Sequence, residues 1–380
     1  MKHQKHANIT RPNYGNFGRQ EWAIIGTPCG NIQQLAYALT NILQKKYKVA
    51  YVDADHKSGD EEEIESPTLK QGGTLEYTDK INYHQFNLDA KLDTYQFRQY
   101  FNEQDIVLVN GNHFKAKHQI VVIDPRKEKS LEKKLDRLTD VQLILLEGDA
   151  KEVYPFLQKE IKNIDVIPLL HVSRKEEIAD FIFQKIEEAK PVLNGLVLAG
   201  GKSQRMGKDK GAIEYHGKPQ REYMADLLAK ICDHTYLSVR PNQAIESEYS
   251  QMEDKMIGLG PFGAILSAFQ KDPNAAWLVV ACDLPFLDEK ALAHLKENRA
   301  ISKIATAFYN PETNFPDPLV TIWEPKSYPI LLSFLAQGYS CPRKVLINSD
   351  IEILNYDSSI LTNVNDPVAF EKIIQQLSSK

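Results

Sequence analysis

An apolar run that ends abruptly at two glycines is the feature that most constrains the fold. Residues 196–199 read Leu-Val-Leu-Ala, and Gly200 and Gly201 follow directly. A short apolar run bounded by glycine is typical of a buried strand. Glycines carry no side chain that would block a ligand, so their backbone amides can contact an anion. The pattern therefore predicts a buried strand that leads into a ligand-binding turn.

Basic residues follow the two glycines at close spacing. Four cations occur within nine residues and are interrupted by one acid, Asp209: Lys202, Arg205, Lys208 and Lys210. Such a cluster balances the charge of a polyphosphate when backbone amides of the same turn face the anion. The alternative is a surface turn with solvated lysines, which is the more frequent meaning of a lone glycine pair.

The whole stretch of residues 198–210, LAGGKSQRMGKDK, resembles the signature loop of the sugar-nucleotide type nucleotidyltransferases. It is most similar to the loop of the molybdenum cofactor guanylyltransferases. The resemblance implies a Rossmann-like nucleotidyltransferase fold in which Arg205 and Lys210 hold phosphates as catalytic residues. It also implies nucleotide contacts from the loop, at Leu198, Ala199, Gly200, Gly201 and Lys210.

A second apolar run, residues 277–282, ends at the sequence Asp283-Leu284-Pro285-Phe286. A carboxylate at the tip of a buried strand is a hard oxygen ligand that suits Mg²⁺. The motif is similar to the metal-binding element of the same family. This implies that Asp283 is catalytic, binds the nucleotide and binds Mg²⁺. Without the first loop, an aspartate here would more often cap a helix, a role that we assign to Asp288.

Two further candidates for nucleotide binding lie between these motifs. Arg240 ends a predicted strand, residues 235–240, and open α/β sheets bind ligands at the carboxyl ends of their strands. A nucleoside contact from Arg240 or Asn242 and a plain surface turn both remain open. Asp254 precedes the sequence GLGPFG, which resembles the acidic residue and G-P-L-x-G of the family. The alternative for Asp254 is an exposed loop acid.

Near the end of the chain, residues 362–370 resemble the N-x-N-T-P-E-D element of these transferases. The resemblance implies that Asn365 binds the second substrate or the metal, although Asp366 replaces the usual threonine and the acid after the proline is missing. Residues 314–323 border the pocket of the second substrate in the family. Residues 340–344 form either a basic surface for a pterin phosphate or a solvated loop.

The first half begins with a strand at residues 22–25, a glycine-containing loop, a helix at residues 32–46 and a strand at residues 49–52. This βαβ order points a helix N-terminus at whatever the loop binds. A working P-loop needs a lysine and a hydroxyl residue after its last glycine. Asn31 and Ile32 stand there, so we expect no nucleotide hydrolysis at this loop.

Residues 105–115 and 120–123 predict two more strands, separated by a polar loop. Their arrangement is similar to that of the P-loop adaptor protein of guanine dinucleotide cofactor synthesis, with Asn110 where that family has an acid. The resemblance implies a degenerate adaptor domain. Polar and acidic residues predict a long exposed excursion at residues 59–94.

The remaining patterns complete two α/β domains. Further strands are expected at residues 141–146 and 164–169, and a short strand and turn at residues 212–219. Helices are expected at residues 131–138, 175–190, 222–232 and 328–335. Alternating strands and helices predict, in each domain, a mostly parallel sheet with helices on both faces. Pro191 ends the helix before it, so we place the domains at residues 1–190 and 191–380.

Composition supports this organisation and excludes some functions. A chain of 380 residues is long enough for two cores, and a formal charge of −5 argues against nucleic-acid binding. The four cysteines lack the spacing of a zinc site or a disulfide framework, which favours reduced thiols and a cytoplasmic location. Uninterrupted apolar runs stay shorter than 18 residues, so we expect no membrane span.

The resemblance implies one reaction, the transfer of GMP from GTP to molybdopterin, with Mg²⁺ as cofactor and release of pyrophosphate. The phosphates of GTP and CTP are alike, so a cytidylyltransferase acting on molybdopterin or another phosphorylated acceptor is an alternative. A second alternative is a non-catalytic protein that binds the cofactor and delivers it. Recipient molybdoenzymes are further expected partners.

Overall fold

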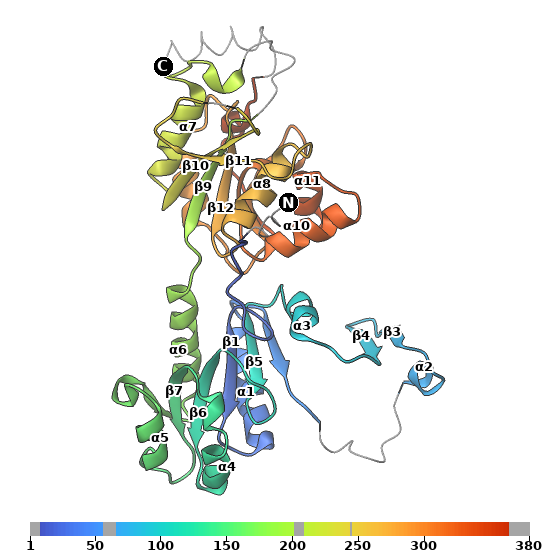
Figure 1. The fold of residues 1–380 in the computed structure, drawn as a ribbon, viewed down its shortest axis with the longest axis vertical. Helices are drawn as coiled ribbons and strands as arrows, with labels where there is room; N and C mark the ends of the chain where they lie inside the picture. Colours follow the sequence, from blue (N-terminus) through green and yellow to red (C-terminus); the bar gives the residue numbers. More distant parts are fainter. Residues whose placement is uncertain (1–7, 56–65, 201–208, 244, 365–380) are drawn as a thin grey trace, which may run out of the picture. The chain divides into compact units, whose positions relative to one another are not determined.

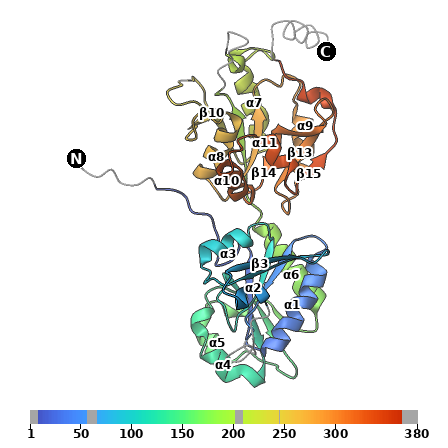
Figure 2. The ribbon, with the colours of Figure 1, turned by 90° about the vertical axis from the view of Figure 1, so that its right-hand side faces the viewer.

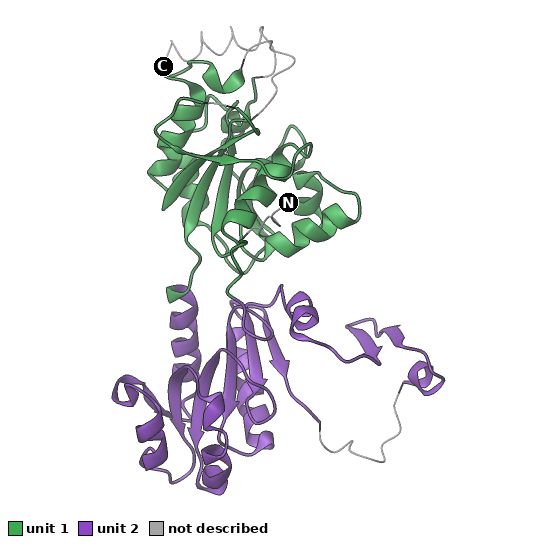
Figure 3. Ribbon diagram, viewed as in Figure 1, with its two compact units in different colours: residues 1–13, 188–380 green, residues 14–187 purple. Residues whose placement is uncertain are grey.

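The computed structural model describes residues 8–55, 66–200, 209–243 and 245–364. The chain divides into two compact units, residues 14–187 and residues 188–380 together with residues 1–13 (Figure 3). Each unit contains its own large sheet, so each is described by itself. The α/β class predicted from the sequence is confirmed in both units.

The unit of residues 14–187 is built on a six-stranded sheet in the order β2-β5-β1-β6-β7-β8 (Figure 1). Its strands are β1 Glu21–Ile25, β2 Val49–Val52, β5 Ile106–Asn110, β6 His118–Ile123, β7 Val141–Leu146 and β8 Leu169–His171. All neighbouring strands pair in parallel. The central strands β1 and β5 are buried along their whole length, as expected for a sheet covered on both faces.

Helices cover both faces of this sheet: α1 Cys29–Leu43, α3 Thr94–Tyr100, α4 Glu128–Glu132, α5 Pro155–Glu160 and α6 Lys175–Glu188. Successive side chains of a strand point to opposite faces. The Trp22 ring of β1 contacts Phe181 of α6 edge-on at 6.3 Å between ring centroids. On the opposite face, Ile25 of β1 packs in one cluster with Leu157 of α5. Strand β1 therefore lies between two helical layers.

Two predictions in this unit are wrong. Residues 164–169 contain a 3₁₀-helix, Ile164–Val166, and the strand begins only at Leu169, because Pro168 has no N–H for a sheet bond. Residues 131–138 hold the end of α4 and a separate 3₁₀-helix, Leu135–Arg137. The exposed excursion predicted at residues 59–94 agrees with the described part, residues 66–94, where most side chains are exposed, and this part also contains ordered elements. These are α2 Pro67–Lys70 and a hairpin of β3 Leu75–Asp79 and β4 His84–Leu88.

The second unit contains a seven-stranded sheet in the order β11-β10-β9-β12-β14-β13-β15 (Figure 1). The strands are β9 Leu193–Leu198, β10 His234–Val239, β11 Ser250–Glu253, β12 Ala276–Ala281, β13 Ala305–Asn310, β14 Phe315–Trp323 and β15 Glu352–Leu354. Strands β11, β10, β9 and β12 are mutually parallel, and β14 is antiparallel to both β12 and β13. The sheet is therefore mostly parallel, as predicted.

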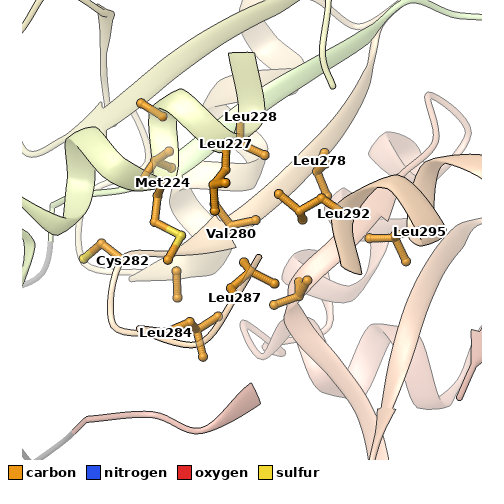
Figure 4. Close-up of a cluster of buried hydrophobic side chains, with 14 of the residues drawn as sticks. Met224, Leu227, Leu228, Leu278, Val280, Cys282, Leu284, Leu287, Leu292 and Leu295 are labelled. Carbon is orange, nitrogen blue, oxygen red and sulfur yellow. The ribbon is translucent and has the colours of Figure 1, made fainter. Parts of the chain in front are cut away.

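Alternate residues of β12 enter two separate cores. Leu278 and Val280 pack with α7 Gln220–Ala229 and α9 Glu289–Glu297, a cluster that includes Met224 and Leu292 (Figure 4). Trp277 belongs to the cluster on the other face. That face is covered by α8 Pro261–Lys271, α10 Ser327–Ala336 and α11 Pro342–Ile347, labelled in Figure 2. The central strand is thus buried from both sides.

The short strand and turn predicted at residues 212–219 correspond to a single bridge and the bends that it encloses, so no strand forms within these described residues. The chain forms a 3₁₀-helix, Lys210–Ala212, and a single bridge from Glu214 to Pro219. The capping role predicted for Asp288 is confirmed, since its Oδ1 accepts the N–H of Ala291 at 2.8 Å at the start of α9. Among the residues that the structure describes, none of the helices is both long and apolar enough to cross a membrane.

Candidate functional site

Four parallel strands of the second unit end at one edge of their sheet, which we call the carboxyl edge. The chain leaves β9 through Ala199, β10 through Arg240, β11 through Asp254 and β12 through Cys282. Antiparallel β14 starts at this edge, because Val280 near the end of β12 pairs with Val320. Open α/β sheets bind ligands at such an edge. The described residues predicted to bind the nucleotide therefore lie on neighbouring segments.

Lys210 and Asp283 form an ion pair, with Lys210 Nζ 3.0 Å from Asp283 Oδ2. The two side chains are 19% and 21% exposed, so a ligand can reach both. Asp209 fixes the start of the 3₁₀-helix on which Lys210 lies, because its Oδ1 accepts the N–H of Gly211 at 3.0 Å. Arg221 in turn donates to Asp209 Oδ2 at 2.7 Å. The ion pair thus joins the 3₁₀-helix Lys210–Ala212 to the segment that follows β12.

The strand tip is anchored by its apolar neighbours. Cys282, Leu284 and Leu287 point into the cluster beneath α7 and α9 (Figure 4). Burial raises the pKa of the Cys282 thiol to about 12, and the adjacent Asp283 carboxylate adds to the effect. Cys282 is therefore an uncharged core residue at neutral pH. The buried residues on either side leave the Asp283 carboxylate as the group of the tip that faces ligands.

Three consecutive backbone carbonyls of residues 283–285, here called the Asp283 loop, each accept a hydrogen bond from a distant segment. Val364 N donates to Asp283 O at 3.2 Å, and Gln220 Nε2 donates to Leu284 O at 3.3 Å. His216 Nε2 lies 2.9 Å from Pro285 O and is the donor, since a carbonyl only accepts. The His216 ring is stacked on Tyr223 with centroids 3.8 Å apart. These contacts fix the backbone that carries Asp283.

Gln220 and His216 were not predicted as functional residues. Gln220 is fully buried at the start of α7, where an apolar residue would serve packing equally well. Its Oε1 has no partner among the described residues, and burying an unpaired amide oxygen lowers the stability of the fold. A polar residue at the buried start of a helix is the signal that could have identified it.

The segments that follow β9 and β10 lie side by side and are connected by hydrogen bonds. Ala199 N donates to Ser238 O at 3.0 Å, and Gln243 Oε1 accepts the N–H of Arg240 at 3.0 Å. A Cβ at Gly200 would lie 3.3 Å from both Cγ and N of Arg240, so the close approach of the two segments favours glycine. The buried Nε of Arg240 has no hydrogen-bond partner within the described ranges.

Asp254 lies half-buried at the end of β11 beside β10. Ser238 donates its hydroxyl to Asp254 Oδ1 at 2.7 Å, and Asp254 N donates to Val239 O at 2.9 Å. Burial raises the pKa of Asp254 above its ordinary value, while the hydrogen bond from Ser238 acts in the opposite direction. A half-buried carboxyl group whose pKa is raised is more typical of a binding site than of a solvated loop.

Three predicted site residues, Gly201, Arg205 and Asn365, lie outside the described residues. Val364, directly before Asn365, is buried and donates to Asp283 O as described above. The structure thus brings Lys210 and Asp283 together and places the residue preceding Asn365 beside them.

A second polar group lies at the start of β14. Asn310 and Asp317 are both buried, and Asn310 Nδ2 donates to Asp317 Oδ2 at 3.4 Å. Leu319 N donates to Asp317 Oδ1 at 2.9 Å. The sequence indicated only a stretch near the second substrate, residues 314–323, and these contacts identify its buried polar pair. Part of the predicted basic loop at residues 340–344 belongs to α11.

The oxygen ligands at this edge suit a metal ion that is bound by both the protein and a substrate. Groups of three or more histidine, cysteine or acidic side chains that could hold an ion are not found in the described part of the chain. Asp283 offers an accessible carboxylate that is paired with Lys210. Mg²⁺ is commonly bound by one or two carboxylates, phosphate oxygens and water. The residues present therefore fit Mg²⁺ carried by a nucleotide.

The loop after β1 in the first unit has Asn31 and Ile32 where a P-loop has its lysine and hydroxyl. Cys29 begins α1, and its Sγ lies 3.2 Å from His113 Nε2. Nearby, Asn110 Nδ2 donates to Asp53 Oδ1 at 2.7 Å. A thiol, an imidazole and an amide thus lie near the loop in which a P-loop would carry its lysine and hydroxyl.

Comparison with known proteins identifies a family for one region. Residues 195–351 match the model described as MobA-like NTP transferase domain. A molybdenum cofactor biosynthesis bifunctional protein from Synechocystis sp. is 34% identical over 193 residues, which cover 50% of this chain and 56% of that protein. A molybdenum cofactor guanylyltransferase from Pseudomonas putida is 26% identical over 189 residues, covering 47% of this chain and 96% of that protein.

Solved structures are also similar. Molybdopterin-guanine dinucleotide biosynthesis protein A from Archaeoglobus fulgidus is 20% identical with a TM-score of 0.43, covering 49% of this chain and 100% of that one. A nucleotidyl transferase from Methanothermobacter thermautotroptrophicus is 13% identical with a TM-score of 0.41, covering 50% and 98%. The adaptor-like nature of residues 1–190 stays a prediction.

Proposed function

We propose that this chain transfers GMP from GTP to molybdopterin, because residues 195–351 match the model described as MobA-like NTP transferase domain. Relatives named molybdenum cofactor guanylyltransferase support the choice of donor and acceptor. The observation that carries the proposal is the pair of Lys210 and Asp283, which lies at the carboxyl edge and inside the matched region.

The reaction needs positioning and charge neutralisation rather than covalent catalysis. A terminal phosphate oxygen of molybdopterin attacks the α-phosphorus of GTP and forms a new P–O bond. The bond between the α-phosphorus and the bridging oxygen breaks, and pyrophosphate leaves with that electron pair. Nothing is oxidised or reduced, so the site needs only cations and hydrogen-bond donors.

Lys210 and Asp283 suit this reaction because they satisfy one another before the nucleotide binds. Their 3.0 Å ion pair avoids leaving one charge alone in a partly buried site. With GTP and Mg²⁺ bound, Lys210 would neutralise phosphate charge and Asp283 would hold the metal. Charge balance is therefore kept before and after the nucleotide binds. Mg²⁺ would be held by Asp283 and would supply stabilisation of charge on the phosphates.

The nucleoside would lie beside the exits of β10 and β11. Guanine presents an N–H and an amino group on one edge, and a carboxylate can accept from both. Asp254 is half-buried, and Ser238 already holds one of its oxygens. Arg240 lies close to Gly200. We propose that these groups select guanine and that Asn365 acts on the second substrate or the metal.

Nucleotide competition tests the donor. The purified chain is incubated with molybdopterin, Mg²⁺ and either GTP, CTP or ATP, and pyrophosphate release is measured. GTP should give the highest kcat/KM by at least roughly tenfold, which corresponds to about 1.4 kcal/mol of selective binding. A preference for CTP would make the chain a cytidylyltransferase and refute the choice of GTP.

A further inference from the structure

The hairpin of β3 and β4, labelled in Figure 1 beside α2, exposes its apolar face. Its outward side chains include Leu75, Tyr77, Phe86 and Leu88, which are 53%, 52%, 65% and 38% exposed. The same face ends with Asp79 and His84. Contiguous exposed apolar side chains on a soluble unit mark an interaction site.

The polar face of the hairpin is the one that is partly covered. Glu76, Thr78, Gln85 and Asn87 are half-buried, and Asn87 Nδ2 donates to Glu76 Oε1 at 3.3 Å. Thr68 of α2 donates its N–H to Glu76 Oε2 at 3.0 Å. Hydrogen bonds with Thr68 lower the pKa of Glu76 to about 2, so Glu76 is ionised at neutral pH. Within the described residues of its unit, the polar face is thus satisfied and the apolar face is exposed.

The exposed face is ordered as three cross-strand pairs. Leu75 lies opposite Leu88, Tyr77 opposite Phe86, and Asp79 opposite His84. The rings of Tyr77 and Phe86 contact one another with their centroids 5.0 Å apart and their planes tilted by 42°, so the aromatic pair is preformed. Two strands alone are marginally stable in water, so a second layer over this face would add stability.

The turn between the strands extends the apolar surface. Ile81 has a φ of 70°, a region that β-branched residues rarely adopt, and its side chain is 94% exposed. Asp79 Oδ1 accepts the N–H of Ile81 at 2.8 Å and holds this conformation. The strained residue therefore presents an apolar side chain to the solvent at the tip of the hairpin.

We infer that this face binds the same face of a second copy of the chain. A twofold axis that runs along the strands, between the two faces, places β3 of one copy over β4 of the other. Tyr77 then meets Phe86 of the partner subunit, and Leu75 meets Leu88 of the partner subunit. The same rotation brings the Asp79 carboxylate to the imidazole N–H of His84 of the partner subunit. Apolar groups meet apolar groups, and the acid meets a donor, so the face is complementary to itself.

The small size of the face sets the expected affinity. A hairpin face with its turn is smaller than a standard interface, which buries about 800 Å² on each partner. We therefore expect a dimer that forms reversibly, with a Kd on the order of micromolar. Sheets packed face to face lie about 10 Å apart, which lets the aromatic rings of both copies interdigitate.

Sedimentation velocity of the full chain between about 1 and 100 μM tests the dimer. The wild-type chain should shift from monomer to dimer with concentration. Tyr77→Ser combined with Phe86→Ser should raise the dimer Kd at least tenfold. Val166→Ser is the matched control, because Val166 is 80% exposed but lies outside the face. A chain that stays monomeric throughout, or a dimer that the double substitution leaves unchanged, overturns the inference.

Charge reversal in two separate chains tests the orientation. Asp79→Lys alone sets a lysine against His84 of the partner subunit, and His84→Glu alone sets two acids together. Each variant should therefore dimerise at least tenfold more weakly than the wild type. A mixture of the two variants should regain wild-type affinity, since both contacts across the heterodimer are then complementary. The pairs within each hairpin stay mismatched, so only contacts between copies explain a recovery. Weak single variants whose mixture does not associate overturn the arrangement.

Discussion

At the scale of single residues, the proposed chemistry depends on one carboxylate and one ammonium. Asp283 is partly exposed between buried neighbours, so its side chain contributes little packing. Lys210 reaches it from a segment 73 positions away in the sequence. A pair formed over such a separation and open to ligands is more useful for binding an anion and a cation than for stability, since partly exposed ion pairs contribute about 0–1 kcal/mol.

Asp283→Ala should remove transfer activity and leave the fold intact. Losing the metal ligand should lower kcat/KM by roughly a thousandfold, because the metal stabilises charge on the leaving phosphates. Pyrophosphate release over a range of Mg²⁺ concentrations measures the effect.

Asp288→Ala is the matched control, because Asp288 caps α9 and lies five residues away. It should cost about 1 kcal/mol of stability and lower Tm without changing kcat. Wild-type rates from Asp283→Ala at limiting Mg²⁺ would contradict the assignment.

Asp254→Asn should raise stability and lower activity with GTP. Burial raises the pKa of Asp254 above its ordinary value of 3.8, so the folded chain holds this proton more tightly than the unfolded chain does. Its contribution to stability is therefore lost as the pH rises through that range. The variant should have a higher Tm than the wild type at pH 7, and the difference should shrink at pH 4.

The catalytic effect of Asp254→Asn follows from its proposed hydrogen bonds with guanine. The variant should lose at least roughly tenfold in kcat/KM for GTP, since hydrogen bonds to a charged group contribute about 1.5–3 kcal/mol. Thermal melts and initial rates on the same preparations measure both effects. An unchanged kcat/KM for GTP would remove Asp254 from the nucleotide site.

At the scale of elements, the sequence predicts strands where apolar runs are dense and fails where they are sparse. Strands β1, β7, β9 and β12 are predicted because buried central strands are continuously apolar. β11 is missed because Ser250–Glu253 places one buried side chain on an edge strand. Hairpin β3–β4 is missed because its alternation lies within a polar region and its apolar side faces outward.

The same distinction holds for the site. Lys210 and Asp283 are predicted because each lies in a local motif. The donors that fix the Asp283 loop are not predictable in this way, because Gln220 and His216 lie 64 and 69 positions from the carbonyls that they contact. Only the folded chain brings them together. Sequence reasoning identifies the chemical groups, and tertiary structure identifies what holds them.

Gln220→Leu should lower activity more than stability. It leaves the buried Leu284 carbonyl without its donor, but it also removes the unpartnered Oε1 of Gln220, so the two effects on folding oppose each other. The Asp283 loop should loosen, which should raise the Mg²⁺ concentration for half-maximal rate by about tenfold, with partial rescue at high Mg²⁺.

His216 offers a paired test of the same loop. His216→Gln can still donate to Pro285 O and should retain most activity, whereas His216→Phe keeps the stacking on Tyr223 and loses the hydrogen bond. The phenylalanine variant should therefore show the same shift in Mg²⁺ dependence as Gln220→Leu. Equal Mg²⁺ dependence in all variants would show that these contacts serve packing alone.

At the scale of the whole molecule, two α/β units share one chain but differ in chemistry. The second unit holds paired charges at its carboxyl edge, and the first holds Cys29, His113 and Asn110. We propose that residues 1–190 bind a recipient molybdoenzyme or the cofactor. Covalent linkage would then keep product and recipient at high effective concentration.

The full chain carrying Asp283→Ala should not hydrolyse GTP. The β1–α1 loop has Asn31 and Ile32 where a P-loop has the lysine and hydroxyl that neutralise phosphate and hold Mg²⁺. Phosphate release from GTP and Mg²⁺, without acceptor, should match the rate without protein. Steady phosphate release would show that this loop is active and that its sequence was misread.

Label transfer from GTP carrying ³²P at the α-phosphate tests the central claim most directly. The full chain is incubated with this GTP, molybdopterin and Mg²⁺, and the label in the pterin product is counted alongside released pyrophosphate. We predict that the label appears in a molybdopterin guanine dinucleotide in equal amount to pyrophosphate, and that Asp283→Ala abolishes both. Label that stays in GTP, or pyrophosphate released without labelled dinucleotide, would contradict the proposed transfer.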